Sequence, residues 1–270
     1  KAKLVLRSNG VAPRTTATAR VLRNMHLDRP EDLIIKEPTS PQIHITAQQA
    51  DTYTRKAAKS ANDEPDVFGW SMGMLHCVAG HKTKGPDDIT HQVARLISLI
   101  ANCKAPPALT HMLTTGYLTP TNKIPYKEQT ERIEAGHDPL VRPVNSGSCI
   151  LKAALRLAAA SPSGTKAIRS LQPVQFGQGV RSGPELVTHL ARALNKLGYI
   201  ITTQDVVNAF NAMNRQALLD TVHTKWPEAV NIFNTYYGID SDCLYASIAD
   251  NAEFIYHIFL SKQGTRMGCV

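Results

Sequence analysis

Apolar residues recur with a helical period in several parts of the chain. Between residues 89 and 100 they follow one another at three- and four-residue intervals, which places them on one face of a helix. Leucines at positions 186, 190, 194 and 197 form a similar stripe in residues 184–197. The pattern predicts further helices over residues 47–61, 150–157 and 214–226, the last two with Ser148 and Asn214 as N-caps.

Short β-branched or alternating runs predict the strands. Residues 199–205 are the strongest case, a buried strand that ends on Asp205. Residues 243–248 and 253–260 alternate around a turn and predict a hairpin. Weaker strand patterns cover residues 33–35, 43–45 and 141–144. From residue 184 the order is helix, strand, helix, hairpin, which predicts an α+β fold with helices packed on one face of a mostly antiparallel sheet.

The glycine-rich stretch of residues 175–183 has neither Walker spacing nor the dinucleotide-binding fingerprint. Ser182 and Glu185 stand three residues apart around Pro184, as in a capping box. The stretch is therefore expected to start a helix and not to hold a phosphate.

Charge and cysteine content narrow the class of protein. The 270 residues carry 30 Lys and Arg against 22 Asp and Glu, a formal net charge of +8 that favours a polyanionic partner. Residues 1–27 contain six of these cations and no acid, so they either follow a phosphate backbone or form a solvated arm. Five scattered cysteines, none in a CxxC pair, indicate a reducing, intracellular compartment, and no apolar run is long enough to span a membrane.

Two residues are candidates for phosphate chemistry. A strand that delivers Asp205 to a sheet edge could hold a divalent metal over a phosphate, although an ordinary surface aspartate fits the same pattern. Arg142 precedes Pro143 in an extended run and could offer its guanidinium group to phosphate oxygens. A surface arginine, or one paired with an acid, is the alternative.

Several motifs in a fixed order resemble the reverse transcriptases of non-LTR (LINE-type) retrotransposons. Residues 205–211 resemble the first palm motif of that family, and residues 263–269 resemble its QG motif. The remaining blocks are 85–89 (GPDGI-like), 118–123 (fingers block), 142–144 (RPI-like) with Lys152 after it, and 175–185 (QxGF-like). The resemblance covers about residues 80–270.

The chain departs from the family at three positions and in one missing motif. Asp88 stands where the family has glycine, Met267 where it has glutamine, and Val270 where proline is common. The second carboxylate pair of the family follows the QG motif and does not occur in these residues. The 270 residues are therefore expected to be a fragment that is inactive by itself.

The resemblance implies a right-hand polymerase fold and a set of roles. Residues 1–79 would be a basic extension of unknown role, 80–198 the fingers and 199–270 a partial palm. Nucleotidyl transfer to a primer 3′ end would use two Mg²⁺ ions, or Mn²⁺, which need carboxylates from two strands. Asp205 would be catalytic and supply one of these carboxylates, and Val206 would add its backbone carbonyl group.

The remaining implied roles concern the nucleotide and the nucleic acid. Phe210 would lie beneath the sugar of the incoming dNTP, where its ring leaves no room for a 2′-OH. The other implied nucleotide-binding residues are Lys123, Arg142, Gln263 and Gly264. Lys152, Arg181 and Arg266 would contact the RNA template and DNA primer.

Two alternatives remain beside the reverse transcriptase, which would act in the nucleus. One is a decayed or domesticated polymerase-like domain that serves as an RNA-binding scaffold, favoured by the missing carboxylate motif. The other is a viral RNA-dependent RNA polymerase. Such enzymes usually place an acid near Phe210 to bind the 2′-OH, and none stands there.

Overall fold

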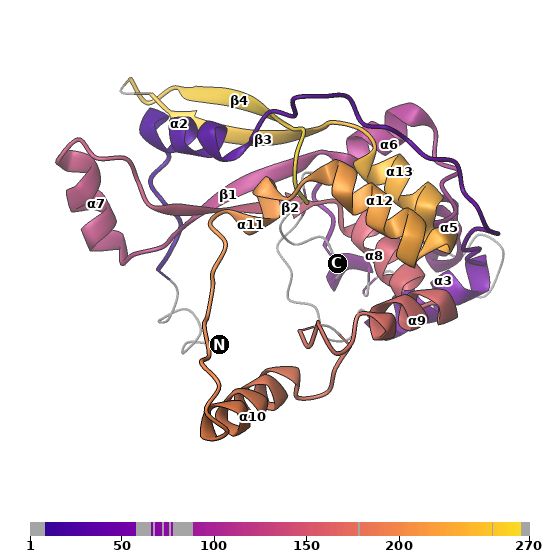
Figure 1. Ribbon diagram of the computed structural model, residues 1–270. Helices are drawn as coiled ribbons and strands as arrows, with labels where there is room; N and C mark the ends of the chain where they lie inside the picture. The colour runs from indigo at the N-terminus through magenta and orange to yellow at the C-terminus, as the bar shows by residue number, and fades with distance from the viewer. Residues whose placement is uncertain are drawn as a thin grey trace.

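The computed structural model describes residues 9–57, 66, 68–71, 73–75, 77, 89–177, 179–249 and 251–265 (Figure 1). These residues form an α+β structure. The strands are β1 (Gly116–Asn122), β2 (Val141–Gly147), β3 (Ser241–Ile248) and β4 (Phe254–Ser261). The helices are α2 (Thr16–Met25), α3 (Ala47–Ala57), α5 (Ile89–Ala101), α6 (Pro107–Thr114), α7 (Tyr126–Glu134), α8 (Cys149–Ala159), α9 (Pro162–Ser170), α10 (Gly183–Lys196), α11 (Ala209–Ala212), α12 (Arg215–Lys225), the 3₁₀ helix η2 (Pro227–Ala229) and α13 (Val230–Tyr237).

The four strands form one sheet in the order β2-β1-β3-β4. Two antiparallel hairpins, β1–β2 and β3–β4, meet through a short parallel pairing of Gly116 with Cys243 and Tyr117 with Leu244. The sheet is thus mixed and mostly antiparallel, and the predicted hairpin of residues 243–260 is confirmed.

Helix α2 packs on one face of this sheet. Leu22 is fully buried against a small core that includes Tyr245 of β3 and Phe259 of β4. Thr15 caps the helix through a bond from the Thr18 amide to its hydroxyl oxygen. Residues 16–25 are therefore folded onto the sheet and do not form the solvated arm considered from the sequence. The opposite face of β4 is exposed at Phe254, Tyr256, Ile258 and Leu260.

The larger core lies between helices. Ile97 and Ile100 of α5 and Ala154 of α8 are fully buried in it, and the Tyr236 hydroxyl of α13 donates to the Ile100 carbonyl oxygen at 2.7 Å. The predicted helices over 150–157 and 214–226 are confirmed, including the caps at Ser148 and Asn214. The predicted apolar face of α5 is confirmed except at its start.

Residues 29–45 run across α12 and α13 without forming a strand (Figure 1). Their backbone bonds to α12 and to the η2 turn between the two helices: the Ile34 amide donates to Oε1 of Gln216 at 2.8 Å, and the Ile43 amide donates to the Glu228 carbonyl oxygen at 2.8 Å. The strands predicted at 33–35 and 43–45 are wrong, because the partners of this segment are helix ends and side chains and not another strand. The core draws on residues from both sides of positions 79 and 198, and the domain division stays a prediction.

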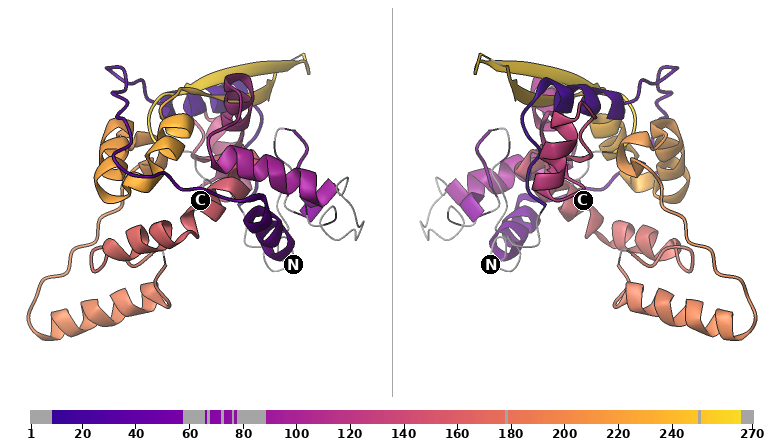
Figure 2. Two further views of the ribbon diagram at one scale, coloured as in Figure 1. Left: turned by 90° about the vertical axis from the view of Figure 1, so that its right-hand side faces the viewer. Right: turned by 90° about the vertical axis from the view of Figure 1, so that its left-hand side faces the viewer.

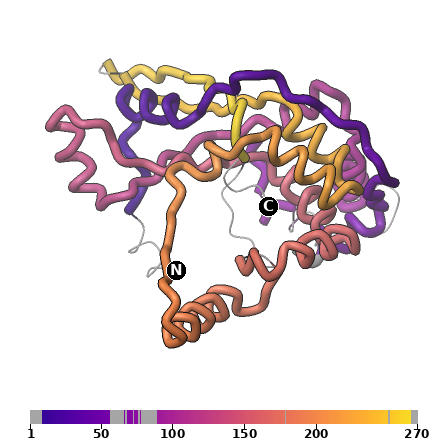
Figure 3. The backbone as a smooth tube through the Cα atoms, in the orientation of Figure 1, coloured from indigo at the N-terminus to yellow at the C-terminus, as the bar shows by residue number. Residues whose placement is uncertain are grey.

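Helix α10 and the segment that follows it lie apart from the other helices and the sheet (Figures 1 and 2). Figure 3 follows the chain out through α10 and back along residues 199–207 to α11. The predicted strand over 199–205 is wrong: these residues are extended, outside the sheet and exposed, Ile200 by 90%. A strand needs a hydrogen-bonded neighbour, and no described strand runs beside this segment.

The N-terminus of α10 differs from the predicted capping box. Ser182 has a positive φ of 53° and makes no side-chain cap bond, so the capping-box prediction is wrong although the helix itself is confirmed. Gly183 packs so closely on the backbone of Phe176 that a Cβ atom there would collide with its carbonyl oxygen. Close packing, and not a side-chain cap, therefore sets the start of α10.

Searched over the described part of the chain, no helix has the length and apolarity that a membrane crossing requires.

Candidate functional site

Two segments far apart in the sequence meet beside α11 and α12. The Thr265 amide donates to the Phe210 carbonyl oxygen at 2.6 Å, and the Gly264 amide donates to the Met213 carbonyl oxygen at 2.8 Å. Gly264 has a φ of +71°, and a Cβ atom there would collide with the backbone of Phe210 and Asn211. The structure thus brings Phe210 of the first palm-like motif against Gly264 of the QG-like motif, and only glycine fits this contact.

Arg215 lies beneath this junction and is 1% exposed. Its guanidinium group donates to the carbonyl oxygens of Gly264, Gln263 and Ile239 and to the Ser261 hydroxyl oxygen. In return, the Arg215 amide donates to Oε1 of Gln263 at 3.2 Å. The Gln263 side chain, predicted to touch nucleotide and template, is therefore engaged with the start of α12.

Phe210 itself is half exposed and outside the core clusters. Its ring lines a cavity of about 370 Å³ together with Trp226, Phe233 and Thr265. Next to it, the Nδ2 atom of Asn211 is buried and has no hydrogen-bond partner among the described residues. A buried donor without a partner is costly, so the junction has a place for a further polar atom, from water, ligand or chain.

Asp205 and Val206 precede this junction on the extended segment. Both are exposed, and Val206 is 66% exposed. The segment is anchored only beyond them, where Asn208 takes a φ of 55° and its Nδ2 atom donates to the Met25 carbonyl oxygen at 2.8 Å. Asp205 is thus accessible, but no described strand holds it at a sheet edge.

Lys123 and Arg142 lie together at the end of the β1–β2 pair where the chain leaves for α7 and returns. Arg142 pairs with Thr121 in the strand register, and the Lys123 amide donates to the Leu140 carbonyl oxygen at 2.9 Å. Both side chains are exposed. The structure therefore brings these two predicted phosphate-binding cations to one place.

The remaining predicted residues are dispersed. Lys152 is half-buried on α8, and Arg181 is exposed before α10. Arg266, Met267, Gly268 and Cys269, and residues 85–88 of the GPDGI-like block, lie outside the described residues. Neither Lys152 nor Arg181 lines the cavity beside Phe210.

Ligands for a metal are incomplete. A search of the described residues finds no group of three or more His, Cys, Asp or Glu side chains that could hold an ion. Asp205 offers one carboxylate, whereas a two-ion site needs carboxylates from more than one element. The described residues alone do not fit a two-ion site.

The perturbed histidines lie at the α2–sheet contact. Burial lowers the pKa of His26, and burial followed by the nearby charge of Arg23 lowers the pKa of His257. Both rings stack on Phe259 at 5.9 Å between centroids. Burial also raises the pKa of Tyr245, on the same face, to about 12. These shifts reflect packing and not a catalytic pair.

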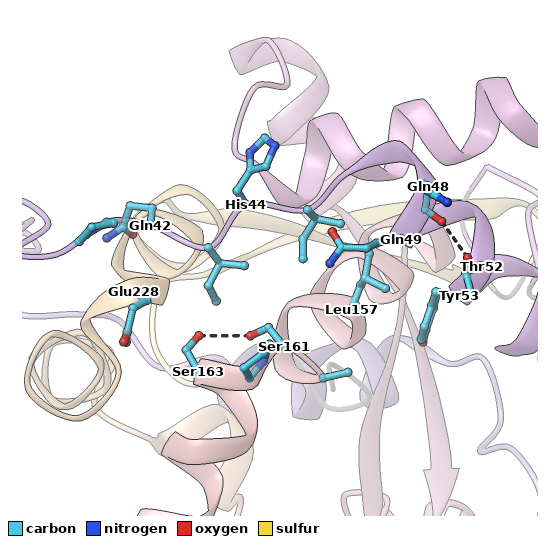
Figure 4. A pocket seen from close by; sticks show the side chains of 15 residues that line it. Gln42, His44, Gln48, Gln49, Thr52, Tyr53, Leu157, Ser161, Ser163 and Glu228 are labelled. Atoms are coloured by element: carbon cyan, nitrogen blue, oxygen red, sulfur yellow. Dashed lines mark hydrogen bonds between the residues drawn. The ribbon is translucent and has the colours of Figure 1, made fainter.

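A larger pocket of about 730 Å³ lies elsewhere, between residues 41–49, α3 and the α8–α9 turn (Figure 4). Ser161 and Ser163 line one side, with their hydroxyl oxygens 3.2 Å apart, and Gln48 and Tyr53 line the other. None of the sequence-predicted site residues lines it.

A scan of the chain against protein-family models and a search of curated proteins found no match.

Sequence reasoning missed two residues that build the junction, Arg215 and Asn208. Arg215 follows the predicted cap Asn214, where a cation is usually solvent-exposed. Asn208 was read only as part of a motif. Asn adopts a left-handed backbone more readily than most residues, and this preference is the signal in the sequence that points to a turn at residue 208.

Proposed function

We propose that residues 80–270 are the fingers and first part of the palm of an RNA-directed DNA polymerase, preceded by an extension. The junction of Phe210 with Gly264 carries this proposal. The two motifs were matched separately in the sequence, and the bond between the Thr265 amide and the Phe210 carbonyl oxygen joins them. The contact of these two motifs, at a position that only glycine fits, supports the proposal.

Phe210 would act as the sugar-facing residue. Its ring is half exposed while its backbone is bonded on the inner side, so the ring can contact a ligand without moving the chain. A flat apolar ring gives a 2′-OH neither space nor a partner, and a buried unpaired hydroxyl costs about 1–3 kcal/mol. The site would therefore prefer deoxynucleotides.

Lys123 and Arg142 would bind the triphosphate. Two exposed cations at one end of a rigid hairpin suit a polyanion, and arginine can bind phosphate oxygens with both arms of its guanidinium group. Lys152, Arg181, Arg266 and the net charge of +8 would serve the RNA template and DNA primer, reading backbone shape and not sequence.

Mg²⁺ or Mn²⁺ belongs to the proposal through Asp205 and the Val206 carbonyl group. When bound, the ions would neutralise phosphate charge. The described residues account for nucleotide positioning, and further carboxylates would have to complete the metal site.

The test uses the full natural chain that contains these residues. We expect dNTP incorporation on an RNA template with a DNA primer and Mg²⁺, and a loss of more than about a hundredfold in Asp205→Asn. Asp138→Asn, at another exposed aspartate, is the matched control and should stay at the wild-type rate.

Other outcomes separate the alternatives. RNA binding without incorporation by the wild-type chain would favour the scaffold, and a preference for rNTP over dNTP would favour an RNA-copying polymerase. Full activity in Asp205→Asn would contradict the assigned role of Asp205.

A further inference from the structure

We infer that Arg215 is a positioning residue that fixes the Gln263–Thr265 segment against Phe210 and so sets the shape of the nucleotide site. This inference rests on the proposed function. It starts from the most buried cation of the described chain, a guanidinium group 1% exposed. A buried charge is tolerated only where hydrogen bonds replace its water, so its partners report what the side chain holds together.

Those partners lie at the end of β4, in the segment that follows β4 and in the segment that precedes β3. Nη2 donates to the Ser261 hydroxyl oxygen and the Gln263 carbonyl oxygen, both at 3.1 Å, and Nε donates to the Gly264 carbonyl oxygen at 3.2 Å. Nη1 donates to the Ile239 carbonyl oxygen at 3.0 Å, before β3. One planar group thus fixes the start of β3 and the end of β4, which pair at the same end of the hairpin, relative to the first turn of α12.

The same segment is bonded back to the chain around α11. Gln263 accepts from the Arg215 amide, Gly264 donates to Met213, and Thr265 donates to Phe210. The segment is therefore held on one side by Arg215 and on the other by the backbone that carries Phe210. Without the bonds from Arg215, the Phe210 backbone loses a fixed neighbour.

Lysine is the informative replacement. It keeps the charge, but its single ammonium nitrogen cannot reach acceptors spread along a planar fork. Arg215→Lys should therefore release some of the acceptors, which are the Ser261 hydroxyl group and the carbonyl groups of residues 239, 263 and 264, while keeping a cation at the site. Ser261→Ala removes one acceptor and should act in the same direction with a smaller effect.

The experiment measures amide hydrogen exchange and nucleotide selectivity in the full natural chain. Arg215→Lys should speed exchange of the Gly264 and Thr265 amides by about ten- to a hundredfold, the loss of one or two charge-assisted bonds. It should also raise the KM for dNTP and lower the preference for dNTP over rNTP by at least about tenfold, with a smaller change in kcat.

Two controls separate positioning from lost stability. Ile97→Ala creates a cavity in the larger core around α5, a helix that contributes no residue to the junction, and provides a variant of reduced stability. It should leave Gly264 and Thr265 exchange unchanged where the chain is still folded. Arg20→Lys makes the same substitution at an exposed arginine and should change nothing.

The outcomes are distinct. Unchanged exchange in Arg215→Lys would overturn the inference, as would faster exchange with unchanged nucleotide selectivity in an active enzyme. A wild-type chain that incorporates no nucleotide would overturn the proposed function instead, whatever the exchange of Gly264 and Thr265.

Discussion

A methyl group at position 264 would meet the Phe210 carbonyl oxygen, and the backbone there is left-handed. Gly264→Ala should therefore lower the free energy of unfolding by about 3 kcal/mol, from strain and overpacking together. Urea denaturation measures the change. Gly136→Ala is the matched control, because Gly136 has a φ of +79° and open space around its Cβ position. It should cost about 1 kcal/mol, and equal losses in both variants would show that the contact at Gly264 is not tight.

Phe210 is the residue whose change should alter selectivity without altering the fold. Its side chain is 50% exposed, so Phe210→Val removes little buried area. If the ring excludes the 2′-OH, the valine variant should incorporate rNTP at least about tenfold better relative to dNTP. Steady-state incorporation with matched dNTP and rNTP pairs measures the ratio, and an unchanged ratio would remove Phe210 from sugar recognition.

Single residues were predictable where their signal is local. Ser148 and Asn214 cap helices as expected, because a cap needs only a short polar side chain beside a helical pattern. Arg215 was not predictable, because its partners at residues 239 and 261–264 are set by the tertiary fold. Ser182 failed as a cap for the same reason: the close packing of Gly183 on Phe176 decides the backbone there.

At the scale of elements, helices α10 and α2 differ in how far their leucines are buried. The leucine stripe of α10 is exposed, with Leu190 48% exposed, whereas Leu22 of α2 is fully buried. Leu190→Asp should therefore change the free energy of unfolding by no more than about 0.5 kcal/mol, and Leu22→Ala should cost about 2–5 kcal/mol. Thermal or urea unfolding compares them, and a large loss in Leu190→Asp would show that the stripe is packed.

The two histidines on Phe259 make the α2–sheet contact sensitive to pH. Their pKa values are lowered in the folded state, so below the ordinary value of 6.5 the unfolded chain binds more protons. This part of the stability is complete above pH 6.5 and decreases as the pH falls below it. The unfolding midpoint should drop between pH 7.5 and 5.5.

His26→Gln tests the origin of that slope. The variant should show a flatter dependence on pH than the wild-type chain, and His189→Gln, at an exposed histidine of α10, should keep the wild-type slope. An equal slope in His26→Gln and the wild type would assign the pH dependence to other groups.

Elements with their own hydrogen bonds were predictable, and an element that needs a partner was not. Helices α8 and α12 and the β3–β4 hairpin follow from local periodicity. Residues 199–205 have the composition of a strand, but composition does not supply a neighbouring strand, and the described sheet offers none. The strands predicted at residues 33–35 and 43–45 are wrong for a similar reason, because side chains and a helix end satisfy the backbone there.

For the molecule as a whole, residues 9–57 are part of the folded body. α2 covers the sheet, residues 29–45 cross α12 and α13, and Ala50 of α3 is fully buried in the larger core. A chain that begins at residue 80 should therefore show no cooperative unfolding transition, since it would expose both cores. Circular dichroism against urea measures this.

The outcome decides whether residues 1–79 are an appendage or an integral part of the fold. If the shortened chain unfolds with the cooperativity of the whole, residues 1–79 are an appendage, and the packing of α2 contributes little. The α+β class was predictable from the order of the elements. The packing of α2 on β3 and β4 was not, because no local pattern encodes contacts between residue 22 and residues 245 and 259.

The packing of α2 on the sheet has a consequence for synthesis on the ribosome. Part of its apolar side packs on β3 and β4, residues 241–261, which are translated long after α2. At roughly 5–20 residues per second, the delay is some tens of seconds. During that interval Leu22 can pack only on Leu118 and Val141 of the β1–β2 pair and lacks Tyr245 and Phe259. The nascent chain therefore exposes part of the apolar side of α2. We expect its folding to depend on chaperones that bind this helix soon after it is translated and release it after β4 has been translated.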